Sequence, residues 1–313
     1  MTSASNLRAM LLLVLVMVFW AGNAIVGRAT AGDIPPLTLA FLRWAGALAI
    51  LAPFAWRHVR NDRAALRAGW KPVLLLGVLG VGAFNALLYS GLQYTTATNA
   101  MLLQAAIPAL VLVLDRVLWK ARSGAWQIAG TLASTIGVVV IVFEGQPQKL
   151  LGLHLGLGDG LVLGSVLTWA LYTVLLRLRP AIHPVSFVAV TFAIGVIAMA
   201  PLALWEHAAG LRVTWNTGTV LAVAYVSVFP SLISYFIFNY AAAELGSARA
   251  GQAITLLPVF GALLSALLLG EVLHGYHAAG IGLICIGIAL GLLALRRQQA
   301  GGAGRKPPLE GGA

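Results

Sequence analysis

Long runs of apolar residues recur along almost the whole chain, and they decide what it can fold into. A helix that crosses the hydrocarbon core of a bilayer needs about 20 apolar residues, because backbone polar groups find no water there. The sequence is 60% hydrophobic and only 9% charged, with a mean hydropathy of +0.92. We therefore predict an all-α integral membrane protein with ten transmembrane helices near residues 9–29, 37–57, 73–93, 96–116, 126–143, 157–177, 185–205, 217–240, 247–270 and 277–296.

The residues that carry chemistry in enzymes are sparse. The connections between the apolar runs are short, so no soluble domain of ordinary size is expected between them. Cys285 is the single cysteine, which excludes an intrachain disulfide or a multi-cysteine metal site. No HExxH motif, clustered carboxylates or nucleophile with a nearby base is present, so we expect no enzyme, no catalytic residues, no metal and no cofactor.

The basic residues report the orientation in the membrane. The net charge is +11, and the positive side chains gather in alternate connections, as the positive-inside rule describes. This pattern predicts that both termini are cytoplasmic and that the positive charge reflects topology, not binding to nucleic acid. The lipid bilayer is the partner expected from the apolar runs. The connection predicted to be cytoplasmic after the second run holds Arg57, Arg60, Arg63, Arg67 and Lys71.

The sequence repeats itself. FWAGNAIVGR, starting at Phe19, and TWALYTVLLR, starting at Thr168, share Trp, Ala and Arg at the same internal positions, 149 residues apart. A similar offset relates Pro36 to Pro184, Pro53 to Pro201, Pro108 to Pro258, Gly130 to Gly280 and Gly137 to Gly287.

The offset divides the chain into two five-helix repeats, predicted at 1–150 and 151–298, followed by a disordered Gly- and Pro-rich tail at 299–313. An odd number of spans in each repeat inverts the second repeat in the membrane. Inverted repeats are typical of secondary transporters, in which two similar halves open a central site to alternate sides.

The segments LLQAAIPALVLVL, QAITLLPVFGALL and LLLGEVLHGYHAAGIGLICIGIAL, together with the 5+5 plan, resemble the EamA branch of the drug/metabolite transporter superfamily. The resemblance covers about 9–296, and the chain is more closely similar to the YddG-type bacterial exporters of aromatic amino acids. It implies a multi-pass transporter in the bacterial inner membrane that exports amino acids by alternating access. The first repeat has Lys120-Ala121 where the second has Gly270-Glu271, which puts a transport role for Glu271 in doubt.

Polar and aromatic residues deep in the spans are the candidates for substrate binding, since they normally face the interior of a bundle. Asn85 and Tyr89 are four residues apart, as are Tyr235 and Asn239, at an offset of 150 with the residue types exchanged. A lining of rings and amides suits a substrate with a flat apolar body and a polar end. The full predicted substrate-binding set is Trp20, Asn23, Arg43, Asn85, Tyr89, Gln104, Trp169, Tyr172, Tyr235, Asn239 and Gln252.

Each of these residues has a structural alternative. The amides and rings can instead hydrogen-bond between helices or anchor at the interface. Arg43 can bind a substrate carboxylate or extend toward the outer interface. Pro108 and Pro258 each remove a backbone hydrogen bond in a span and are predicted hinges, with a static kink as the alternative.

Several functions remain open at this point. Other amino acids such as threonine or methionine, and small drugs or metabolites, are the alternative substrates. A channel would need a filter-like loop or a ring of charges, which the sequence lacks, and a membrane enzyme is more remote still. No carboxylate or histidine falls in the middle of a predicted span, which favours export without tight proton coupling, by a monomer or weak homo-oligomer.

Overall fold

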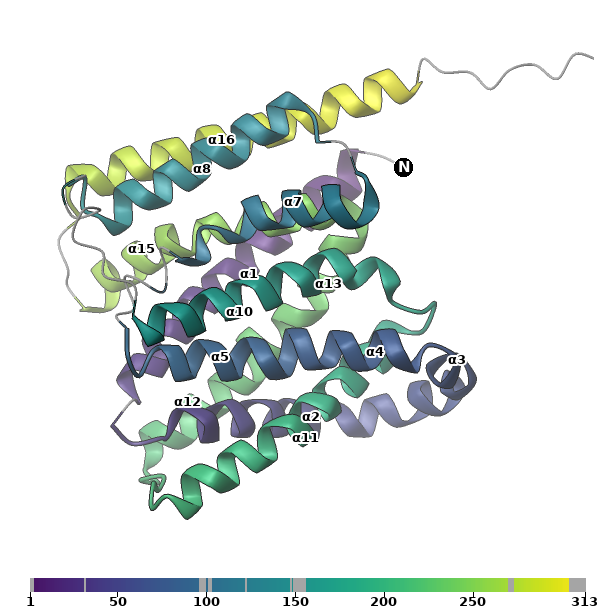
Figure 1. Cartoon of the computed structure of the whole chain (residues 1–313), viewed down its shortest axis with the longest axis vertical. Helices are drawn as coiled ribbons and strands as arrows, with labels where there is room; N and C mark the ends of the chain where they lie inside the picture. Colours follow the sequence, from purple (N-terminus) through teal and green to yellow (C-terminus); the bar gives the residue numbers. More distant parts are fainter. Residues whose placement is uncertain are drawn as a thin grey trace, which may run out of the picture.

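The computed structural model describes residues 3–30, 32–95, 100, 103–121, 123–146, 148, 156–269 and 273–303. This part of the chain is helical and contains no strand. The helices lie side by side in one bundle, with α8 and α16 at one edge and α2 and α11 at the other (Figure 1). The all-helical architecture predicted from the apolar runs is therefore confirmed for the described residues.

The first half supplies the helices that precede residue 150. A π-helix, η1, interrupts the span that runs from Trp70 to Gly91. The helices of this half are α1 (Ser3–Ala29), α2 (Pro36–Asn61), α3 (Arg63–Ala68), α4 (Trp70–Gly77), η1 (Val78–Ala83), α5 (Phe84–Gly91), α7 (Ile107–Trp119) and α8 (Ala125–Val142).

The second half repeats this order. Its long span from Thr217 to Leu245 is likewise interrupted by a π-helix, η3. The helices of this half are α10 (Leu157–Leu175), the 3-10 turn η2 (Leu176–Leu178), α11 (Pro184–Ala208), α12 (Thr217–Ser227), η3 (Val228–Ile233), α13 (Ser234–Leu245), α14 (Ser247–Ala253), the 3-10 turn η4 (Ile254–Leu256), α15 (Leu257–Leu269) and α16 (Gly275–Ala303).

Eight helical segments of the described chain are long and apolar enough to cross a membrane, and Gly275–Gly291 is a shorter apolar helix. The predicted span at 96–116 differs: α7 begins only at Ile107, and 96–99, 101 and 102 lie outside the described residues. The count of ten spans stays a prediction. Helix α16 continues to Ala303, past the start of the tail predicted to be disordered, while 304–313 lie outside the described residues.

The prolines at the predicted hinges stand at the starts of helices. Pro108 is the second residue of α7, and Pro258 is the second residue of α15, directly after the 3-10 turn η4. A proline fits the first turn of a helix because the amide it lacks would have no intrahelical acceptor there. The ninth predicted span therefore stays helical from Ser247 to Leu264, and its hydrogen-bond pattern changes to a 3-10 turn just before the proline.

Equivalent helices of the two halves pack against each other in opposite directions. A Cβ atom on Gly130 would lie 2.5 Å from the carbonyl oxygen of Gly287, and one on Gly137 would lie 2.6 Å from that of Gly280. Such close backbone approach of α8 and α16 is possible only with small residues at the interface. Because the lower number of one helix meets the higher number of the other, the helices are antiparallel and the halves are inverted.

The other pair of equivalent helices, α2 and α11, is joined at both ends by a carboxylate that caps a helix N-terminus. Glu206, near the end of α11, is 2% exposed and accepts hydrogen bonds from the backbone amides of Leu37 and Thr38 at 3.0 and 2.7 Å. At the opposite end, Asp62 accepts a bond of 2.9 Å from the amide of His183. The carboxylates satisfy amides that a helix start leaves free.

Candidate functional site

Aromatic rings from both halves meet in the middle of the bundle. Trp20 of α1 and Trp169 of α10 occupy equivalent positions, and their rings meet edge to face with centroids 5.2 Å apart. Trp44 of α2 and Phe192 of α11 are also equivalent, 148 residues apart, and their centroids are 4.9 Å apart. Each half therefore contributes matching rings to one cluster, which the Tyr235 ring joins at 5.1 Å from Trp44.

A Tyr–Asn hydrogen bond is repeated in the two halves, and it joins one member of each predicted exchanged pair, Tyr89 or Asn239, to a residue of the first helix of its half. Asn23 of α1 donates to the Tyr89 hydroxyl of α5 at 3.4 Å, and the Tyr172 hydroxyl of α10 donates to Asn239 of α13 at 2.6 Å. Asn23 and Tyr172 are 149 residues apart, and Tyr89 and Asn239 are 150 apart. The amide and the phenol have changed places, so the first helix of each half is the donor in both bonds, but asparagine donates to tyrosine in one and tyrosine donates to asparagine in the other.

The two π-helices are equivalent as well, and each presents a carbonyl to the opposite half. A π-helix is a rare break in the regular hydrogen-bond pattern that occurs often at functional sites. The Gly80 carbonyl of η1 accepts a bond of 2.5 Å from Tyr235, and the Pro230 carbonyl of η3 accepts one of 2.9 Å from the Trp20 indole. Gly80 and Pro230 are 150 residues apart. A side chain of each half thus hydrogen-bonds to the π-helix of the other half, where the backbone departs from regular α-helix geometry.

Arg43 points into this cluster and not toward the membrane interface. Its side chain is buried, with 4% exposure, and the guanidinium lies over the Trp44 ring at 4.6 Å. It donates to the Ser231 hydroxyl at 2.5 Å, to the Pro230 carbonyl at 3.1 Å and to the Tyr89 hydroxyl at 3.2 Å. The alternative in which Arg43 extends to the outer surface therefore does not apply.

Asn85 and Gln252, two further predicted residues, each donate a hydrogen bond to a backbone carbonyl outside the aromatic cluster. Asn85 is buried and donates to the Val81 carbonyl of η1 at 2.9 Å. Gln252 of α14 donates to the Gly287 carbonyl of α16 at 2.9 Å, an interhelical bond of the kind that the structural alternative describes.

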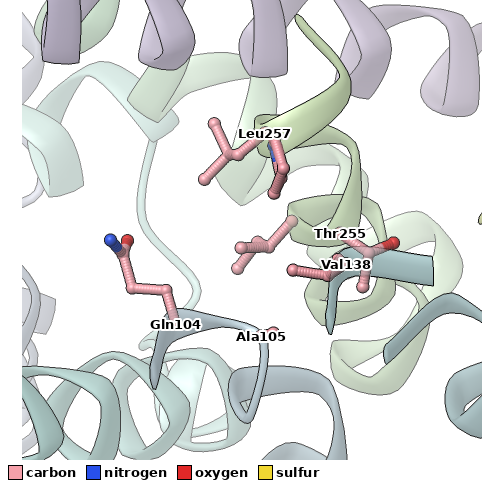
Figure 2. Close-up of a pocket in the computed structure, with 7 residues that line it drawn as sticks. Gln104, Ala105, Val138, Thr255 and Leu257 are labelled. Atoms are coloured by element: carbon pink, nitrogen blue, oxygen red, sulfur yellow. The ribbon is translucent and has the colours of Figure 1, made fainter. Parts of the chain in front are cut away.

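Gln104 lines a small cavity between the two proline-containing segments. Figure 2 shows its amide across the opening from Leu257 and Thr255. The cavity has a volume of about 10 Å³, about the room that one water molecule needs. The residues that line it are Gln104, Ala105, Val138, Ile254, Thr255, Leu257 and Pro258.

Several polar atoms of the central cluster are buried without a hydrogen-bond partner in the described structure: Asn23 Oδ1, Trp44 Nε1, Trp169 Nε1 and Asn239 Nδ2. Buried polar atoms are normally paired, because leaving one unpaired costs about 1–3 kcal/mol. These donors and acceptors lie among tilted and edge-to-face rings, and they can hydrogen-bond to a polar group that reaches the cluster. Among the described residues, no group of three His, Cys, Asp or Glu side chains is placed to hold a metal ion.

A second polar network lies at the end of the bundle predicted to be cytoplasmic. Asp115 of α7 accepts a bond of 2.5 Å from Arg177 of η2 and another of 2.5 Å from Ser247 of α14. Asp115 is 5% exposed, and the Arg177 guanidinium also lies 4.9 Å from the centroid of the Trp119 ring. We call Asp115, Arg177 and Ser247 the Asp115 network; it joins α7 of the first half to η2 and α14 of the second.

Sequence reasoning did not find this network, although one signal pointed to it. Arg177 is the last residue of the repeated motif, which marked it as part of a duplicated feature. Asp115 was visible only as a carboxylate at a span end. The side chain of the equivalent residue Arg28 lies outside the described residues.

Comparison with known proteins places the fold. The profile of the EamA-like transporter family matches the chain twice, at residues 7–143 and 156–293. An uncharacterized transporter of Archaeoglobus fulgidus is 31% identical over 90% of this chain and 96% of its own length. A probable amino-acid metabolite efflux pump of Salmonella typhimurium is 26% identical over 91% of this chain and 95% of its own length. A solved crystal structure with 21% identity covers 93% of this chain and 99% of its own, with a TM-score of 0.71, and shows the same fold.

Proposed function

Because the chain belongs to the EamA-like transporter family, we propose that it exports amino acids, aromatic ones above all, through the centre of the bundle. Membership makes it a membrane transporter of small molecules and points away from an enzyme. The relative in Salmonella typhimurium that is named as a probable amino-acid metabolite efflux pump supports this substrate class.

The observation that carries the proposal is the meeting of equivalent rings and amides from inverted halves. Trp20 meets Trp169, and the Asn23 to Tyr89 bond is repeated as Tyr172 to Asn239. A site shared by two inverted halves can be opened toward either side by exchanging their conformations. Rings provide stacking area for a flat side chain, and the unpaired amide atoms provide hydrogen bonds for a polar end.

In this proposal, the predicted substrate-binding set acts in two groups. The rings of Trp20, Trp169 and Tyr235 hold the apolar body, while Asn23 and Asn239 orient the head group. Tyr89, Tyr172, Asn85 and Arg43 complete the same layer, and Gln104 and Gln252 lie toward α7 and α14.

In this proposal, the substrate does not fit the central cluster as it is packed here. The ring centroids of Trp44 lie 4.9 Å from Phe192 and 5.1 Å from Tyr235, so substrate entry requires the halves to separate. In this proposal, the Asp115 network keeps the bundle closed at the end predicted to be cytoplasmic. Pro108 and Pro258, at the starts of α7 and α15, are proposed to allow these helices to move, and Pro258 also lines the small cavity.

We place the protein in the inner membrane of a bacterium, as a monomer or weak homo-oligomer with both termini cytoplasmic. The basic connections support this orientation. Transport of threonine, methionine or small drugs is the alternative within the same mechanism. Cationic drugs fit the central cluster less well, since its one charged group among the residues described above is the cation Arg43.

The test is transport by the purified chain in proteoliposomes with a panel of phenylalanine, tryptophan, threonine, methionine and a cationic drug. We expect the aromatic amino acids to be transported fastest. Transport should persist when an ionophore collapses the pH gradient, because no carboxylate contacts the central cluster in the described structure. Transport of the drug alone would refute the amino-acid proposal, and strict dependence on the pH gradient would reveal a proton site.

A further inference from the structure

Arg43 is a buried cation whose hydrogen-bond partners are all neutral. Its guanidinium bonds to the Ser231 hydroxyl, the Tyr89 hydroxyl and the Pro230 carbonyl. No carboxylate among the described residues lies within ion-pair distance of it, in contrast to Arg177, which pairs with Asp115. A charge inside a membrane protein is costly without a counter-ion. An anion that binds beside Arg43 would remove this cost.

The partners of Arg43 do not depend on it. The Pro230 carbonyl also accepts from Trp20 at 2.9 Å, the Tyr89 hydroxyl also accepts from Asn23 at 3.4 Å, and the Ser231 hydroxyl donates to the Val226 carbonyl at 2.6 Å. The guanidinium can therefore leave any of the three without leaving a buried group unpaired. A purely structural arginine would be expected to satisfy groups that have no other partner.

A matching acceptor belongs to Asn23, which donates to the same hydroxyl as Arg43. Arg43 and Asn23 both donate to Tyr89, and the side-chain oxygen of Asn23 is buried without a partner. An unpaired cation and an unpaired amide oxygen around one hydroxyl complement a carboxylate and an ammonium group, respectively. The rings of Trp20 and Trp44 flank these groups: Trp20 donates to the carbonyl that Arg43 also contacts, and Trp44 lies under the guanidinium.

We propose that Arg43 binds the carboxylate of the transported molecule, which therefore must carry one. The inference rests on the proposed function and adds a substrate requirement to it: amides, esters and amines that lack the carboxylate bind poorly. Carboxylate oxygens replace neutral partners of the guanidinium, since charge-assisted bonds are roughly twice as strong as neutral ones.

This exchange also links binding to opening. Arg43 belongs to α2 of the first half, and two of its three partners, Pro230 and Ser231, belong to η3 of the second half. When the substrate carboxylate binds the guanidinium, Arg43 releases its contacts to Pro230 and Ser231. Pro230 and Ser231 keep their bonds to Trp20 and Val226. The substrate thus weakens the closed arrangement that it enters.

The experiment measures binding to the purified full chain in detergent by ligand-induced shifts of the melting temperature. The ligands are matched pairs of a carboxylate and its primary amide: tryptophan and tryptophanamide, threonine and threoninamide, and indole-3-propionate and its amide. In each pair that binds, the carboxylate should bind about tenfold or more tightly than the amide. In Arg43→Gln the difference should fall below about threefold, while Arg43→Lys should keep part of it.

Arg57→Gln is the matched control, because Arg57 lies on the same helix but is exposed; it should keep the wild-type preference. Should Arg43→Gln not fold, Arg43→Lys makes the same comparison, and a preference equal to that of the wild-type protein would overturn the inference. Equal binding of amides and carboxylates, or no binding of either member of any pair, would overturn the inference. A carboxylate preference shown only by non-aromatic ligands or by indole-3-propionate would uphold it while refuting the aromatic amino-acid function.

Discussion

The indole rings of Trp20 and Trp169, equivalent residues of two inverted repeats, meet edge to face with their centroids 5.2 Å apart. Equivalent positions of the two sequence repeats are thus in direct contact in the folded protein. Around this contact, each half contains one Tyr–Asn hydrogen bond. Each half also has one π-helix carbonyl that accepts a hydrogen bond from a side chain of the other half. Equivalent residues from both halves are therefore gathered in one cluster.

The close packing of α8 and α16 predicts a position-specific effect of adding a methyl group. In Gly287→Ala, the new Cβ would lie 2.5 Å from the Gly130 carbonyl oxygen and 2.7 Å from the Ser134 amide nitrogen, both backbone atoms. We expect a loss of about 1–3 kcal/mol in stability, measured as a lower melting temperature in detergent.

Gly282→Ala on the same helix is the control, since no atom lies within 4 Å of its added Cβ. This variant should be neutral or slightly stabilising, because alanine has the higher helix propensity. Equal melting temperatures for the two variants would mean that α8 and α16 do not approach as described.

The positive-inside pattern predicts opposite labelling of two exposed arginines. In a Cys285→Ser background, Arg212→Cys, in the connection before α12, should react with an impermeant thiol reagent added to whole cells. Arg63→Cys, in the connection after α2, should react only once the membrane is opened. Labelling of position 63 in intact cells would reverse the proposed orientation.

The Asp115 network predicts a change in opening at one end of the bundle. Asp115→Asn removes the ion pair with Arg177 and weakens the bond to Ser247, contacts worth about 1.5 kcal/mol or more, or about tenfold in the opening equilibrium. Ala250→Cys, at a position on α14 that is 0% exposed, should then be labelled about tenfold faster in inside-out vesicles.

Arg116→Gln controls for a change of charge on the same helix, as Arg116 is exposed, and should leave the labelling rate unchanged. The same rate in Asp115→Asn as in the parent would show that the network does not hold this end closed.

The apolar runs were long enough to predict helices and their approximate positions, and the 150-residue offset predicted which residues would be equivalent. The apolar pattern did not predict the π-helices η1 and η3, whose carbonyls accept bonds that Tyr235 and Trp20 make across the halves. The direction of Arg43 was also undetermined, since helical spacing allows both an interfacial and an interior arginine. Gln252 was grouped with the central residues by its position near Pro258, yet its partner, Gly287, lies on another helix.

The role of a buried carboxylate was also not predictable from the sequence. Glu206 lies near the end of a predicted span, and nothing local indicates that it caps α2 of the other half. Such a contact depends on the packing of α2 against α11, which the sequence pattern alone does not provide.

The central claim is that amino acids cross where the Tyr–Asn pairs of the two halves meet, and the ratio of tryptophan to threonine transport in proteoliposomes tests it most directly. Tyr89→Ala or Tyr235→Ala should lower this ratio about two- to tenfold, because a ring contact contributes roughly 0.5–1.5 kcal/mol beyond its buried area. Asn23→Ala or Asn239→Ala should slow both substrates alike, since these amides are proposed to orient the head group that is common to both. If all four variants, at wild-type amounts in the membrane, transport both amino acids at wild-type rates, these residues do not line the path and the account is contradicted.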